Sequence, residues 1–181
     1  MAPFSPMVYI PGSQKDAMLA KKVTDIIEIA HKKDVKPGQK GTTNHWVFYL
    51  VTSPKESVRI DCTPSGLDGT TGKGTMKANI VVSALPYSCS TNVEAASKTS
   101  LKPAKAITVK AIVDLITSKG LEKYDFNAEG TGCRFWNGRV LDEMAKAGLV
   151  AAADVAKAKA SILKLWPSGK PLALDQGAFY K

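Results

Sequence analysis

The sequence predicts an α+β fold in which an antiparallel sheet packs on helices. Two β-branched and aromatic stretches, residues 45–51 and 57–63, flank a turn and predict a hairpin, whose strands pair antiparallel. Residues 76–85 predict a third strand. Apolar residues at helical spacing predict helices over residues 13–33, 108–120, 133–147 and 152–165.

The elements are separated by segments rich in glycine, proline and small polar residues. Ser13, after the Pro11-Gly12 turn, is the expected cap of the first helix, and Thr108 that of the second. Gly120 and Gly148 are expected to end the second and third helices. Loops are expected over residues 36–41, 64–75 (glycine-rich and mobile) and 86–103, and a short strand or turn over 124–127.

Length and composition predict a single catalytic domain over residues 1–181, with residues 168–181 as a tail that either covers a face or is mobile. A chain that is 44% apolar and 23% charged is globular rather than disordered. No apolar run approaches the roughly 18 residues that cross a bilayer. The first residues carry no basic segment followed by an apolar core, so we expect a cytoplasmic protein without a membrane partner.

Alternation along the hairpin assigns its two faces. Residues 46, 48 and 50 share one face with residues 58, 60 and 62, and these are expected to form the core. The opposite face then carries His45 and Tyr49 beside Arg59 and Asp61. His45 and Asp61 are therefore expected to be neighbours, although Asp61 paired with Arg59 on a solvated face is an equally simple interpretation.

The chain has three cysteines, Cys62, Cys89 and Cys133, and two histidines. The cysteines are too few and too scattered for a disulfide framework and form no CxxC pair, so we expect free thiols, no metal and no cofactor. His31 lies in a basic His-Lys-Lys run and is expected at a solvated helix end. That leaves His45 as the candidate base near neutral pH.

Cys133 lies where a glycine-bearing loop meets a predicted helix, in the stretch Gly130-Thr131-Gly132-Cys133-Arg134. The unpaired N–H groups of a first helical turn favour thiolate over thiol, and Arg134 adds a positive charge. A nucleophilic thiol needs a base, and the base needs a group that holds it in one tautomer. His45 and Asp61 supply those roles. The alternative is a small buried residue at a helix start.

The Asn-His-Trp strand followed by a Gly-Cys helix start resembles the circularly permuted NlpC/P60 papain-like proteins, including the lecithin-retinol-acyltransferase group. This resemblance implies a permuted papain-like fold, with Cys133 as nucleophile, His45 as base and Asp61 in the place of a second polar residue, often histidine. It covers roughly residues 44–63 and 130–149. The chain departs from it in Gly132 and in Arg134-Phe135 after the cysteine, and we expect no membrane anchor.

The combination of Ser-Val-Arg-Ile-Asp with Gly-Cys-Arg-Phe-Trp also resembles the fungal arginine-containing cyclodipeptide synthases, which implies aminoacyl groups delivered on tRNA. The net charge of +9, from 25 Lys and Arg against 16 Asp and Glu, suits aminoacyl-tRNA or another anionic acyl donor. Because the charge is diffuse, a lysine surface tuned for solubility explains it as well.

Three functions follow as expectations: a cysteine-dependent acyl transferase, most specifically a tRNA-dependent cyclodipeptide synthase; an amidase or peptidase with the same Cys-His pair; and a non-catalytic nucleic-acid-binding module. Any carboxylate that selects arginine would come from residues near Cys133 in sequence, namely Asp125, Glu129, Asp142 and Glu143. The candidate substrate-binding residues are Arg134, Trp136, Asn44, Glu129 and Tyr49, of which Trp136 also suits a core position.

Overall fold

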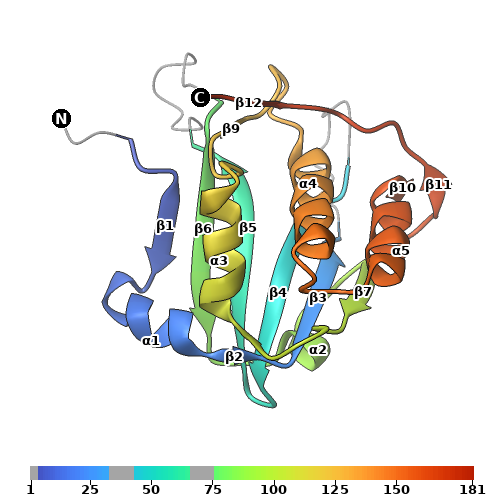
Figure 1. Ribbon diagram of the computed structural model, residues 1–181. Coiled ribbons are helices and arrows are strands. Elements are labelled where there is room, and N and C mark those ends of the chain that lie inside the picture. The colour runs from blue at the N-terminus through green and yellow to red at the C-terminus, as the bar shows by residue number, and fades with distance from the viewer. Residues whose placement is uncertain (1–3, 33–42, 66–75) are drawn as a thin grey trace.

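The computed structural model describes residues 4–32, 43–65 and 76–181, and a six-stranded sheet forms its centre (Figure 1). β1 pairs parallel with β6, and every other neighbouring pair in this sheet is antiparallel. The strands in spatial order are β1 (Met7–Ile10), β6 (Ala78–Leu85), β5 (Glu56–Pro64), β4 (Trp46–Ser53), β3 (Asp25–Ala30) and β7 (Ser97–Leu101).

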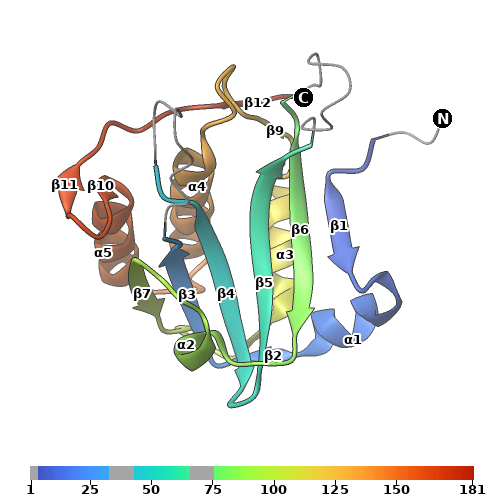
Figure 2. The same cartoon turned by 180° about the vertical axis from the view of Figure 1, so that it is seen from behind.

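Helices cover one face of the sheet and enclose the main core. Figure 1 shows α3 (Val109–Ser118), α4 (Cys133–Lys146) and α5 (Ala152–Ile162) in front of the strands. Figure 2 shows the opposite face, with α2 (Cys89–Asn92) at one end of it. The expected α+β class, with a sheet packed on helices, is confirmed. No helix within the described ranges is both long and apolar enough to cross a membrane.

The hairpin has the two faces that alternation predicts. Trp46, Phe48 and Leu50 lie in the core under the helices together with Val58, Ile60 and Cys62, whereas Val47 and Tyr49 belong to a smaller cluster on the other face. β4 and β5 pair with Phe48 opposite Ile60 and Leu50 opposite Val58. Each strand therefore contributes apolar side chains to the core from every second position.

The prediction of one helix over residues 13–33 is wrong after residue 20, where the helix ends. A 3₁₀ turn η1 (Gly12–Gln14), without a side-chain cap from Ser13 or any other residue, leads into α1 (Lys15–Ala20). The chain then forms β2 (Lys22–Val23) and β3. Residues four apart, such as Ile26 and Ala30, share a face in a helix and in a strand alike, so spacing did not separate the two. Adjacent β-branched residues suit a strand buried on both faces, which β3 is.

The predicted loop over residues 86–103 contains α2 and β7, so it is more regular than expected. β7 is an edge strand and, apart from Leu101, carries polar side chains, which is why its composition is typical of a loop. Thr108 precedes α3 without a side-chain capping bond and lies in β8 (Ile107–Thr108), which pairs with β2. The expected loop over 36–41 lies outside the described residues, as does the expected loop over 64–75 apart from Pro64, which ends β5, and Ser65.

The tail crosses the end of the molecule at which α4 begins (Figures 1 and 2). α5 ends earlier than predicted, because Lys164–Leu165 form β10, which pairs with β11 (Lys170–Pro171). Farther on, β12 (Ala178–Phe179) pairs with β9 (Tyr124–Asp125), the short strand expected near residue 124. The tail is thus tied to the segment that precedes α4.

Candidate active site

Cys133, His45 and Asp61 come together at one end of the sheet, from three separate elements. Cys133 is the first residue of α4, His45 precedes β4, and Asp61 lies in β5. Cys133 and His45 face the same pocket of about 210 Å³. The pocket is lined by Thr43, Asn44, His45, Cys62, Pro64, Phe126, Gly130, Thr131 and Cys133. The proximity of the thiol and the imidazole that the sequence predicts is confirmed.

The start of α4 is fastened to the start of β4. The paired registers of β4 and β5 run from the turn to Phe48 and Ile60. Two positions before Phe48, the carbonyl of Trp46 accepts from the side-chain amide of Asn137 at 3.2 Å, and the same amide donates to the carbonyl of Cys133 at 2.8 Å. The bond to Trp46 therefore connects α4 to β4 beside the catalytic candidates Cys133 and His45.

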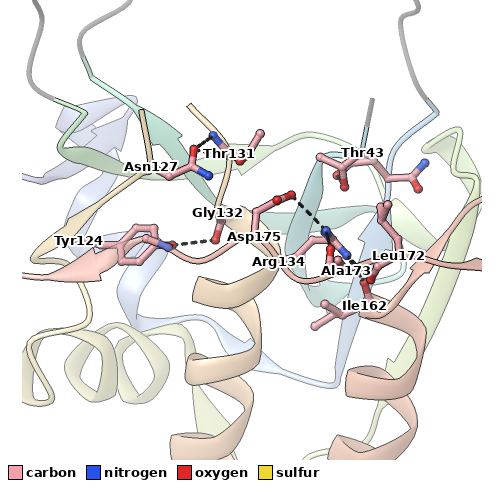
Figure 3. Close-up of polar contacts among 12 residues, drawn as sticks. Thr43, Tyr124, Asn127, Thr131, Gly132, Arg134, Ile162, Leu172, Ala173 and Asp175 are labelled. Atoms are coloured by element: carbon pink, nitrogen blue, oxygen red, sulfur yellow. Dashed lines mark hydrogen bonds and ion pairs between the residues drawn. The ribbon is translucent and has the colours of Figure 1, made fainter. Parts of the chain in front are cut away.

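Gly132 permits the turn into α4. Its φ of 141° lies in a region that favours glycine, and a Cβ there would lie 2.5 Å from the hydroxyl oxygen of Tyr124. That hydroxyl donates to the carbonyl of Gly132 at 2.9 Å (Figure 3). The preceding loop is held by Asn127, whose Oδ1 accepts from the backbone N–H and the hydroxyl of Thr131. The pocket wall before Cys133 is therefore built by local bonds.

The imidazole of His45 lies between a carboxylate and a thiol. Its Nε2 is 2.7 Å from Oδ1 of Asp61, whose other oxygen accepts from the guanidinium of Arg59. Burial lowers the pKa of His45, but hydrogen bonds with Asp61 and Cys133 and the negative charges of both groups raise it to about 10. Burial would raise the pKa of Asp61, yet the hydrogen bond and charge of His45, with Arg59, lower it. Both expected partners of Asp61 are thus present.

His31 is the site residue that the sequence did not identify. It was expected at a solvated helix end; instead it follows β3, and its backbone N–H donates to the carbonyl of His45. The two imidazole rings stack with centroids 6.3 Å apart, and Nε2 of His31 lies 3.1 Å from the hydroxyl of Tyr49. Burial lowers the pKa of His31, as do the charges of His45 and Arg59. Recognising β3 as a strand would have placed His31 beside His45.

Two of the expected substrate-binding residues support this site. Asn44 is buried, lines the pocket, and joins His31 to Trp166 by donating to both carbonyls at 3.0 Å. Tyr49 is buried on the outer face of the sheet beside His31, and burial is the main cause that raises its pKa to about 12. Neither the ring nor the hydroxyl of Tyr49 belongs to the pocket lining as described.

Arg134, Trp136 and Glu129 do not have the positions expected of substrate-binding residues. Arg134 is only 2% exposed and points from α4 to the tail (Figure 3). Its guanidinium donates to backbone carbonyls and to one carboxylate, at Ile162, Leu172, Ala173 and Asp175. Trp136 lies in the core and donates to the carbonyl of Leu121 at 2.7 Å. Glu129 is exposed and lies outside the pocket lining.

The acidic residues considered for arginine selection also lie elsewhere. Asp142 pairs with Lys159, and Glu143 pairs with Lys146 on the far part of α4. Neither they nor Asp125 is among the pocket residues that the structure describes. Among all the residues that the structure describes, no group of three or more His, Cys, Asp or Glu is placed to hold a metal ion.

The other two cysteines are buried. Cys62 lies on the core side of β5 and also lines the pocket, and burial raises its pKa well above the ordinary range. Cys89 is enclosed in the smaller cluster on the other face, and its pKa is also raised by burial. Both are free thiols, as is Cys133. Cys62 and Cys89 provide internal references for the reactivity of Cys133.

Comparison with known protein families gives a match to a family model. A family model described as "Domain of unknown function (DUF7770)" matches residues 26–180. The matched range begins in β3 and includes His31, His45, Asp61 and Cys133. No curated protein and no solved structure matches the chain.

Proposed function

The chain belongs to the DUF7770 family, and we propose that it is a cysteine-dependent acyl transferase. In this proposal Cys133 is the nucleophile, His45 its base, and Asp61 the group that orients His45. One observation carries it: an imidazole shared between a buried carboxylate and the first thiol of a helix, facing a pocket. A thiol, its base and an orienting group form the constellation that acyl transfer requires.

The proposed reaction begins with a proton on His45. Since hydrogen bonding to Asp61 engages Nε2, we assign Nδ1 as the nitrogen that exchanges a proton with the site. With the pKa of His45 raised to about 10, its imidazole carries a proton at neutral pH. The sulfur attacks the acyl carbon and forms a tetrahedral intermediate. As the C–O bond breaks, His45 gives its proton to the departing alcohol, which leaves a thioester on Cys133.

The second half transfers the acyl group to an amine. His45, now neutral, takes a proton from the amine as it attacks the thioester carbon, and the Cys133 sulfur leaves as thiolate. Both tetrahedral intermediates carry an oxyanion. The N–H groups of the first turn of α4, at Cys133 and Arg134, are the donors that we assign to it, and one such donor is worth about 3–4 kcal/mol.

The resemblance to the permuted NlpC/P60 papain-like proteins supports the proposal. The cysteine begins a helix, the histidine precedes a central strand of an antiparallel array, and the histidine comes first in the chain. We therefore propose a permuted papain-like arrangement. Asp61 takes the orienting role, and His31 stacks on the outer side of the base.

For the donor we propose aminoacyl-tRNA, and for the product an arginine-containing cyclodipeptide. The net charge of +9 supports a polyanionic donor, and the pocket volume suits a group of amino-acid size. Arginine enters through the resemblance to the fungal synthases. Since the described lining has no acidic side chain, the experiment must compare arginine with uncharged amino acids.

The test is the intact mass of the protein after incubation with tRNA charged with arginine, alanine or leucine. We expect an added aminoacyl mass on the wild type, none on C133A, and an unchanged adduct on C89A, the matched control with a cysteine removed outside the pocket. An adduct lost rapidly to free amino acid supports the hydrolase. Absence of any adduct, with tRNA bound, contradicts acyl transfer and supports the nucleic-acid-binding module.

A further inference from the structure

Glu28 is an acidic residue in the middle of the core. It lies in β3 between Ile26 and Ala30 on the helix-covered face, directly opposite Phe48 of β4 and Thr99 of β7. The residue is 0% exposed, and neither carboxyl oxygen has a hydrogen-bond partner among the described residues. A buried carboxyl group without partners is costly, so its presence calls for a role.

Two other buried polar atoms near the start of α4 also lack partners in the described structure: Nε1 of Trp46 and Oδ1 of Asn137. Trp46 pairs with Ala30, which makes it the diagonal neighbour of Glu28 on the same face. Asn137 contacts the backbone of Trp46 through its Nδ2. One of these atoms is a donor and the other an acceptor. A protonated carboxyl group offers one of each, whereas a carboxylate only accepts.

We propose that Glu28 is held as a neutral carboxylic acid that accepts a hydrogen bond from Trp46 Nε1 and donates one to Asn137 Oδ1 through buried water. Glu28 is then a positioning residue. Asn137 also bonds the carbonyl of Cys133, so fixing its amide fixes the first turn of α4. This inference rests on the proposed function for its consequence at Cys133, although the protonation state of Glu28 is independent of it.

Electrostatic interactions also favour the neutral form of Glu28. Burial raises the pKa of Glu28 well above its ordinary value, and the negative charge at Cys133 raises it further. The interaction is reciprocal, because an ionised Glu28 would oppose a thiolate at Cys133. A neutral Glu28 instead adds no negative charge that acts on Cys133.

The other charged groups on the neighbouring elements are exposed, as Arg139 of α4 is, or have partners away from Glu28. β4 and β7 place Phe48 and Thr99 opposite Glu28, neither of which titrates. Arg134 of α4 donates to the tail. On α5, which packs on β7, the charged side chains have surface partners. These pairs are Lys157 with Asp154 and Lys159 with Asp142.

The test compares Glu28→Gln, whose amide keeps one donor and one acceptor group without titrating, with Glu28→Leu, which keeps only volume. The readouts are the infrared carbonyl band of a protonated carboxyl group at pH 7 and the rate of Cys133 alkylation by iodoacetamide. We expect the band in the wild type and its loss in E28Q. Alkylation should stay within about twofold in E28Q and fall about tenfold in E28L, as for a lost buried hydrogen bond.

Several results would overturn the inference. If the wild type lacks the protonated-carboxyl band, Glu28 is ionised, whatever the function of Cys133. If E28L alkylates as fast as E28Q, the carboxyl group does not position Asn137. If Cys133 of the wild type reacts no faster than Cys62 and Cys89, the proposed function fails, while the infrared band still decides the state of Glu28.

Discussion

At the scale of single residues, the site depends on the contrast between Asp61 and Glu28. Both carboxyl groups are buried, but Asp61 has two cationic partners and a lowered pKa, whereas Glu28 has a strongly raised one. Burial alone disfavours the charged form in both, and only partners reverse it. One carboxylate therefore stabilises the imidazolium of His45, and the other residue keeps the core side of Cys133 uncharged.

Replacing Asp61 with Asn tests the link to His45. The amide removes the negative charge while keeping the shape, so the pKa of His45 should fall from about 10 by about 1–3 pH units. NMR titration of the imidazole signals measures this directly. The H31Q variant is the control, because its neutral side chain leaves Asp61 in place. An unchanged His45 titration in D61N would mean that Asp61 does not hold the imidazolium.

The pKa of His45 also predicts how stability depends on pH. Its value in the folded protein is about 10 against about 6.5 in an unfolded chain, so folding binds a proton between these values. The stabilisation is fully present below pH 6.5 and is lost as pH rises to about 10. The Tm of the wild type should thus fall relative to that of H45Q over this window, by about 2–4 °C per kcal/mol. A constant difference between the two proteins would contradict the shift.

At the scale of elements, the turn into α4 and the tail that crosses it determine where the nucleophile lies. Tyr124 is central to both, because its hydroxyl donates to the carbonyl of Gly132 and accepts from the N–H of Gly177. Arg134, which follows Cys133 in α4, binds the tail through its guanidinium group. Long-range bonds to backbone atoms thus place Cys133 beside the pocket.

Gly132→Ala should destabilise the protein by about 1–3 kcal/mol, because it combines an unfavourable φ with a contact to the Tyr124 hydroxyl. In Y124F that hydroxyl is absent, so the double variant should lose less than the sum of the two single variants. Urea unfolding of the four proteins measures the coupling, and G138A is the control at a helical glycine with open space. Strict additivity would show that the hydroxyl contact contributes nothing.

Arg134→Met should release the tail while preserving much of the buried volume. We expect a loss of about 1–3 kcal/mol and faster proteolysis after residue 165, because three backbone carbonyls and Asp175 lose their donor. Arg139→Met, at an exposed position of the same helix, is the matched control. Equal cleavage rates in the two variants would refute the anchoring role.

At the scale of the whole molecule, the sequence predicted what local patterns determine. Alternation fixed both faces of the hairpin and hence the meeting of His45 with Asp61. Glycine followed by an apolar-periodic run located the start of α4 at Cys133. β3 was missed because its spacing suits a helix as well, and His31 was misplaced with it. The role of Arg134 was missed because its partners are mostly backbone carbonyls of the distant tail, which have no sequence signature.

The proposed acyl transfer depends above all on the activation of Cys133 by His45. The direct measurement is the rate of iodoacetamide alkylation of each cysteine at pH 7, followed by peptide mass spectrometry in the wild type and H45Q. We expect Cys133 to react at least about tenfold faster than Cys62 and Cys89 in the wild type, and to lose most of that advantage in H45Q. Three slow and equal rates in the wild type, or an advantage that H45Q retains in full, would contradict it.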